Sequence, residues 1–138
     1  MNLESIEPNY LIALIGGVAY FAVGWAWYSP MLFTDRWLAA QGKTREGTAT
    51  APEVVPLALN LVASIVVAMV VAAIYEWGGG DGVVDGIVAS LIVSVGVVAM
   101  EAFKGIAYYA QTWMLYAINV AYAIVGIGVA GAIYGAFA

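Results

Sequence analysis

The chain has 138 residues, of which 64% are hydrophobic and only 9% charged, with a formal net charge of -5 and a mean hydropathy of +0.95. Soluble globular domains carry about a quarter charged residues, so this composition indicates a membrane protein. The absence of cysteine and histidine excludes disulfides, thiol nucleophiles and the usual zinc or haem ligands, and the acidic balance excludes nucleic acid as a partner. We therefore expect no cofactor and no metal.

Four apolar runs, each about 20 residues long and without a charge in its middle, predict four transmembrane helices. They cover residues 10–28, 56–77, 83–103 and 113–137. Buried strands are favoured locally by runs such as IVVAMVVAAI, but these runs are too long for strands, and lipid accepts only helices or closed barrels. We predict an all-α polytopic membrane protein whose residues 1–138 form one four-transmembrane-helix bundle.

The cytoplasmic end of the first span is rich in aromatic residues. Trp25, Trp27 and Tyr28 stand where amphipathic rings prefer the headgroup layer, and the segment MLFTDRWLAAQG after them suits a short amphipathic helix in the interface. Interfacial anchoring is the simpler interpretation. In the alternative, Tyr20, Trp25 and Tyr28 form one wall of a pocket for a small molecule or a cation.

The charges predict a single orientation. When the spans alternate, every basic residue falls on one side, namely Arg36, Lys43, Arg45 and Lys104, and the other side receives Glu4, Glu7, Glu76, Asp81 and Asp85. Basic loops remain in the cytoplasm, so we expect a multi-pass plasma-membrane protein with the 29–55 loop inside and both termini outside. The one-sided bias argues against dual topology.

Polar side chains inside the spans are the natural candidates for function, because each costs free energy in hydrocarbon unless it is paired. Two interpretations remain open: bonds that hold helices together, or a polar path or cavity, with Asn60 and Asn119 as its amides. The polar path would be lined by Asn60, Ser64, Ser90, Ser94, Asn119 and Tyr122. The candidate binding cavity, polar and aromatic, would be formed by Tyr20, Trp25, Tyr28, Asn60, Asn119 and Tyr122.

Glu101 and Lys104 are three residues apart on one helix face, near the cytoplasmic end of the third span. The default interpretation is an ion pair whose heads reach the interface. A carboxylate coupled to proton or cation transport is the alternative, which the neighbouring lysine and the position near the end of the span disfavour.

Small residues predict close helix contacts. Gly86, Ser90 and Ser94 form a stripe in the third span, and Gly131 and Gly135 form a GxxxG in the fourth. The first and fourth spans also share an echo, VAYFAVG and VAYAIVG, in which a tyrosine precedes a glycine by four residues. If the echo is structural, its two tyrosines have equivalent packing roles.

The early Asn9, the pattern GWAWYSPMLF followed by Trp37, and the late LYAINVAYAIVGIGVAGAIYG together resemble the family named domain of unknown function 1761. The resemblance covers most of the chain, with its WYSP element at residues 27–30 and its N-x-x-Y element at residues 119–122. It implies a four-helix membrane fold of bacterial and archaeal proteins and no particular activity. The acidic outer loops and scarce lysines are typical of a salt-adapted organism.

Three functions follow, in decreasing order of preference. The first is a structural or accessory membrane module, embedded in the bilayer as a parallel homo-oligomer or bound to another membrane protein. The second is a small transporter or channel for an ion or small solute, with the polar residues above lining its path. A membrane enzyme is least favoured, because without histidine or cysteine its base would be Glu101 or a loop carboxylate.

Overall fold

A computed structural model describes residues 6–29, 31–44 and 54–138 of the chain. Its fold is that of a helical membrane protein. Four long helical segments are apolar enough to cross a membrane: α1 (Tyr10–Trp27), α3 (Val54–Trp77), the segment Val83–Tyr108 and α6 (Trp113–Phe137). The third segment comprises α4 (Val83–Val93), the π-helical η2 (Ser94–Ala99) and α5 (Met100–Tyr108). No strand occurs in these ranges, and the predicted all-α class with four spans is confirmed.

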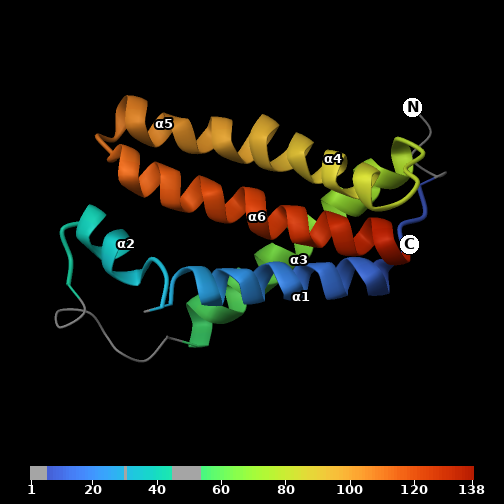
Figure 1. Cartoon of the computed structure of the whole chain (residues 1–138), viewed down its shortest axis with the longest axis horizontal. Coiled ribbons are helices and arrows are strands. Elements are labelled where there is room, and N and C mark those ends of the chain that lie inside the picture. The colour runs from blue at the N-terminus through green and yellow to red at the C-terminus, as the bar shows by residue number, and fades with distance from the viewer. Residues whose placement is uncertain (1–5, 30, 45–53) are drawn as a thin grey trace.

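The four long segments lie side by side, and the short α2 (Thr34–Ala40) sits beside one end of the bundle (Figure 1). The C-terminus, the first described residues and the α3–α4 turn gather at one end, whereas α2 and the α5–α6 connection lie at the other. Helix α6 packs along both α1 and α4, and α3 packs mainly on α1. Consecutive spans therefore alternate in direction, as the charge argument requires.

Local chemistry explains where the helices begin. The Asn9 Oδ1 accepts the Ile12 N–H at 3.2 Å to cap α1, and the Thr112 hydroxyl accepts the Leu115 N–H at 3.1 Å to cap α6. Between α3 and α4, the backbone turns through Gly79 and Gly82 at φ of 68° and 87°. Glycine adopts these angles without strain, so the GGGDG segment forms a tight turn.

Helices α4 and α6 approach each other through glycine. A Cβ added at Gly86 would collide with the carbonyl oxygen of Gly131, and one at Gly131 would collide with that of Gly86. Gly135 lies equally close to the Gly82 carbonyl. The predicted close contact of these small-residue stripes is confirmed.

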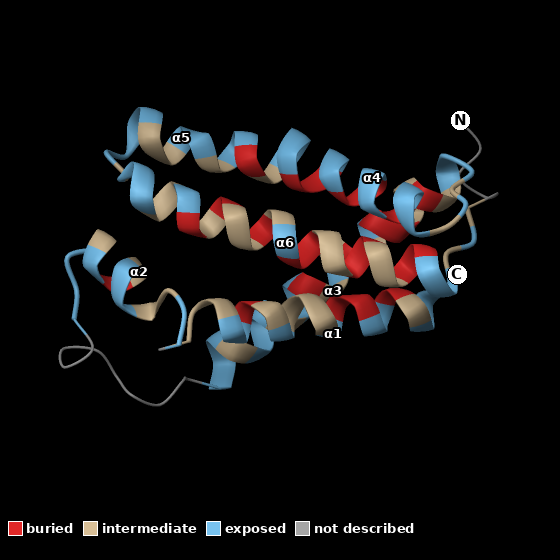
Figure 2. Ribbon diagram, in the orientation of Figure 1, coloured by how far each residue is buried: buried red, intermediate tan, exposed pale blue. Residues whose placement is uncertain are grey.

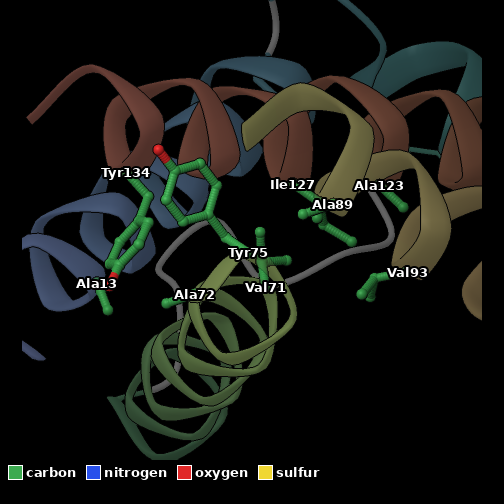
Figure 3. Close-up of a cluster of buried hydrophobic side chains, with 9 residues drawn as sticks. All are labelled: Ala13, Val71, Ala72, Tyr75, Ala89, Val93, Ala123, Ile127 and Tyr134. Carbon is green, nitrogen blue, oxygen red and sulfur yellow. The ribbon is translucent and has the colours of Figure 1, made fainter. Parts of the chain in front are cut away.

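The buried core is concentrated where α1, α3, α4 and α6 meet, and most large apolar side chains on the outer faces are exposed (Figure 2). The core cluster drawn in Figure 3 contains Ala13, Val71, Ala72, Tyr75, Ala89, Val93, Ala123, Ile127 and Tyr134. Exposed side chains such as Leu11, Leu59 and Val97 suit a lipid solvent, which is as apolar as the side chains themselves.

The third segment differs from the expected span. Its helix continues past Phe103 to Tyr108, because the exposed Glu101 and Lys104 end the apolar run without breaking the helix. It also contains the π-helical turn η2, which the sequence did not indicate. The Tyr116 hydroxyl donates to the Ala99 carbonyl at 3.0 Å, so α6 provides a polar contact where η2 ends.

Candidate functional site

Four of the six predicted binding residues come together between α1 and α6, in a group that we call the aromatic seam: Tyr20, Tyr28, Asn119 and Tyr122. The Tyr20 and Tyr122 rings stack with centroids 5.2 Å apart, and Tyr28 meets Tyr122 edge-on at 5.3 Å. The Tyr28 hydroxyl donates to the Asn119 Oδ1 at 2.6 Å. The WYSP and N-x-x-Y elements, far apart in sequence, therefore meet through a direct hydrogen bond.

The sequence echo corresponds to a reciprocal exchange of tyrosine and glycine. A Cβ on Gly126 would collide with the Tyr20 ring, and a Cβ on Gly24 would lie 2.6 Å from the Tyr122 hydroxyl oxygen. Each tyrosine thus fills the space that a glycine of the opposite helix leaves free. Because α1 and α6 are antiparallel, the two contacts are related by a local two-fold arrangement, which confirms the equivalent packing roles.

The short α2 joins the seam. Trp37 meets the Tyr28 ring edge-on at 5.2 Å, Leu38 is buried, and the Thr34 hydroxyl donates to the Tyr28 carbonyl. Trp27 donates its Nε1–H to the Ile118 carbonyl at 3.0 Å. Sequence reasoning assigned the tryptophans to interfacial anchoring and missed these contacts, because no local pattern identifies a partner 91 residues away.

The other two predicted binding residues lie elsewhere. Trp25 is 64% exposed and packs against Phe21 of its own helix, because it is turned away from the face of α1 that meets α6. Asn60 is exposed on α3, and its amide has no hydrogen-bond partner among the described residues. Trp25 and Asn60 therefore do not line one cavity with the other four predicted binding residues.

Ser64 and Ser90 do not form the interhelical bonds of the first interpretation. Ser64 donates to the Asn60 carbonyl at 2.9 Å and Ser90 to the Ile87 carbonyl at 2.7 Å, each within its own helix. A serine hydroxyl reaches a carbonyl of the preceding turn without help from a neighbour. The hydroxyls of Ser94 and Tyr122 are buried and have no hydrogen-bond partner in the described part of the chain.

The predicted ion pair is present. The Lys104 Nζ lies 2.9 Å from both carboxylate oxygens of Glu101, and the two side chains are 58% and 66% exposed. An exposed pair of this kind contributes little to stability, at most about 1 kcal/mol. Its position at the end of the span agrees with the ion-pair interpretation.

A second polar cluster, at the opposite end of the bundle, was not predicted. The Tyr134 hydroxyl donates to the Glu76 Oε1 at 2.7 Å and accepts the Asn9 N–H at 2.7 Å. The Tyr75 ring meets the Tyr134 ring edge-on, with centroids 5.2 Å apart (Figure 3). The Tyr75 hydroxyl accepts the Gly82 N–H at 2.9 Å. These bonds tie the start of α1, the end of α3 and the end of α6 together.

Little else in the described ranges offers binding chemistry. They contain no group of three or more Asp or Glu side chains placed to hold a metal ion. A shallow pocket of about 210 Å³ lies between α3 and α4, lined by Ile74, Tyr75, Gly78, Gly80, Asp85, Val88, Ala89 and Ile92. The arrangement is suited above all to fixing the helices against one another.

Comparison with known proteins agrees with the resemblance. A family model described as "Protein of unknown function (DUF1761)" matches residues 11–135, which is nearly the whole chain. The protein belongs to this family. Searches of curated proteins and of solved structures found no match.

Proposed function

We propose that this member of the DUF1761 family is a membrane module that acts by association, as an oligomer or as an accessory subunit of another membrane protein. The supporting observation is that polar side chains at the end of α1 bond to α6 of the same chain, which leaves these groups unavailable to a substrate. Tyr28 binds Asn119 and Trp27 binds the Ile118 carbonyl, so these side chains are directed at neighbouring helices. Contacts of this kind contribute about 0.6 to 2 kcal/mol each in membranes, enough to fix helix register.

The proposal includes one orientation in the plasma membrane. Arg36, Lys43 and Lys104 belong to segments at the α2 end of the bundle, and Glu76, Asp81 and Asp85 lie at the other (Figure 1). Arg45 and Glu4 are outside the described residues. The positive-inside rule then places α2 in the cytoplasm and both termini outside, and all copies in a membrane run parallel.

A small transporter or channel is the second candidate. It is favoured by the two buried hydroxyls without partners, Ser94 and Tyr122, because an unpaired polar group inside a bundle is costly and marks possible ion or solute paths. Its path would be lined by the predicted set Asn60, Ser64, Ser90, Ser94, Asn119 and Tyr122.

Reconstitution in liposomes distinguishes the two. We expect the purified protein to leave ion and small-solute flux at the level of empty liposomes, and native mass spectrometry in detergent to show an oligomer. Saturable flux that Asn119→Leu abolishes, and that the exposed control Tyr109→Phe leaves intact, would contradict the module and support transport. A monomer in every detergent would contradict the oligomer.

A further inference from the structure

The inward face of α3 is covered along only part of its length. Ser64, Ala68, Val71 and Tyr75 are buried against the bundle. The helical period continues this face toward Asn60, yet the described residues before Ser64 are exposed or only half-buried. The first turns of α3 project from the bundle, and they are pale blue and tan where the later turns carry red (Figure 2). The cytoplasmic part of α3 therefore presents an unpartnered face.

Asn60 makes this face more than an apolar surface. Its neighbours one turn away on the same face, Pro56 and Ala63, are exposed and apolar, and its own amide is exposed and without a hydrogen-bond partner in the described chain. Asn60 lies about 9 Å along the axis from the first residue of α3, which is within a hydrocarbon layer about 30 Å thick. An amide at that depth has two donors and an acceptor that lipid cannot satisfy.

We infer that a second copy of this chain covers this face, with α3 against α3 and Asn60 against Asn60. The inference rests on the proposed function, in which parallel copies associate. Parallel copies related by a two-fold axis along the membrane normal place the same residue at the same depth. An amide is complementary to itself, and the exposed Ala63 one turn later lets the two backbones approach.

The occupant follows from this self-complementarity. A charged or metal-binding partner has no counterpart on this face, because the residues one turn before and after Asn60, Pro56 and Ala63, are apolar. Lipid chains would leave the amide unpaired at every encounter. Only a surface that presents an amide or another neutral hydrogen-bonding group at this depth satisfies it, and a parallel copy always does.

Cysteine cross-linking tests the contact cleanly, because the chain contains no cysteine. In native membranes, oxidation should link Ala63→Cys into a covalent dimer. The matched control Val97→Cys, 55% exposed on η2, should remain a monomer. Adding Asn60→Leu to the Ala63→Cys chain should reduce the linked fraction severalfold, whereas adding Asn60→Gln should preserve it.

Single-molecule photobleaching in liposomes of varied protein-to-lipid ratio measures the affinity. We expect Asn60→Leu to weaken dimerisation about 3- to 30-fold. Equal cross-linking of Ala63→Cys and Val97→Cys, with unchanged affinity in Asn60→Leu, would overturn the α3 interface. If a dimer persisted there, the proposed oligomer would stand without it. A monomer at all ratios would overturn both.

Discussion

Tyr28 and Asn119 form the shortest side-chain link between α1 and α6, at 2.6 Å. The sequence placed these residues in the first and fourth spans and left open whether the polar groups bind one another or line a cavity, and it did not predict which pairs form. Hydropathy gives the depth of a residue, whereas its partner depends on how the helices are rotated. For the same reason the alternative interpretation placed Trp25, three residues before Tyr28, in the same wall, whereas Trp25 faces outward.

We expect Tyr28→Phe to destabilise the bundle by about 1 kcal/mol, because it leaves the Asn119 carbonyl oxygen without its donor. Reversible unfolding in mixed detergent micelles measures the change. Tyr109→Phe is the control, since this tyrosine is 80% exposed. Equal effects of the two substitutions would show that the Tyr28 hydroxyl contributes nothing specific.

At the scale of elements, the fold depends on how closely α4 and α6 approach. Gly86 and Gly131 each lie against the other's backbone carbonyl, so no side chain can move aside to make room. The glycine pattern predicted this contact correctly. The pattern did not reveal η2 or its contact with Tyr116, because a π-helical turn depends on packing that is not local in sequence.

Gly131→Ala should destabilise the protein by about 1 to 3 kcal/mol, the usual cost of overpacking. Gly128→Ala is a matched control on the same helix, because a Cβ there would meet only the Ser90 hydroxyl oxygen, at 3.9 Å. Mixed-micelle unfolding of both variants gives the comparison. A Gly131→Ala protein as stable as Gly128→Ala would mean that the two helices are farther apart than described.

Helix α2 was predicted as an interfacial helix, and its docking against the seam through Trp37 is the added finding. Trp37→Ala removes an aromatic contact of about 0.5 to 1.5 kcal/mol. We expect faster amide hydrogen exchange across residues 34–40, with α1 unaffected. Leu32→Ala, at a side chain 54% exposed, should leave exchange unchanged. Amide exchange across residues 34–40 in Trp37→Ala that is as slow as in the unsubstituted protein would show that lipid alone holds α2 in place.

For the whole molecule, the sequence predicted the class, the spans, the alternation and the exposed Glu101–Lys104 pair, because composition and local spacing determine them. The sequence did not predict the cluster of Tyr134, Glu76 and Asn9. Tyr134 is separated from Glu76 by 58 positions and from Asn9 by 125, and no local signal connects them. Hydrogen bonds between residues so far apart in sequence can be identified only from the packed bundle.

Site-directed labelling tests the claim on which the parallel dimer and the accessory role both depend, namely four spans with a single orientation. Single cysteines at Asp81 and Lys43, exposed at the α3–α4 turn and just after α2, are treated with a membrane-impermeant maleimide in intact cells. We predict that Asp81→Cys reacts at once and that Lys43→Cys reacts only after the membrane is opened. Reaction of both sites in intact cells, or of Lys43→Cys alone, would contradict the account.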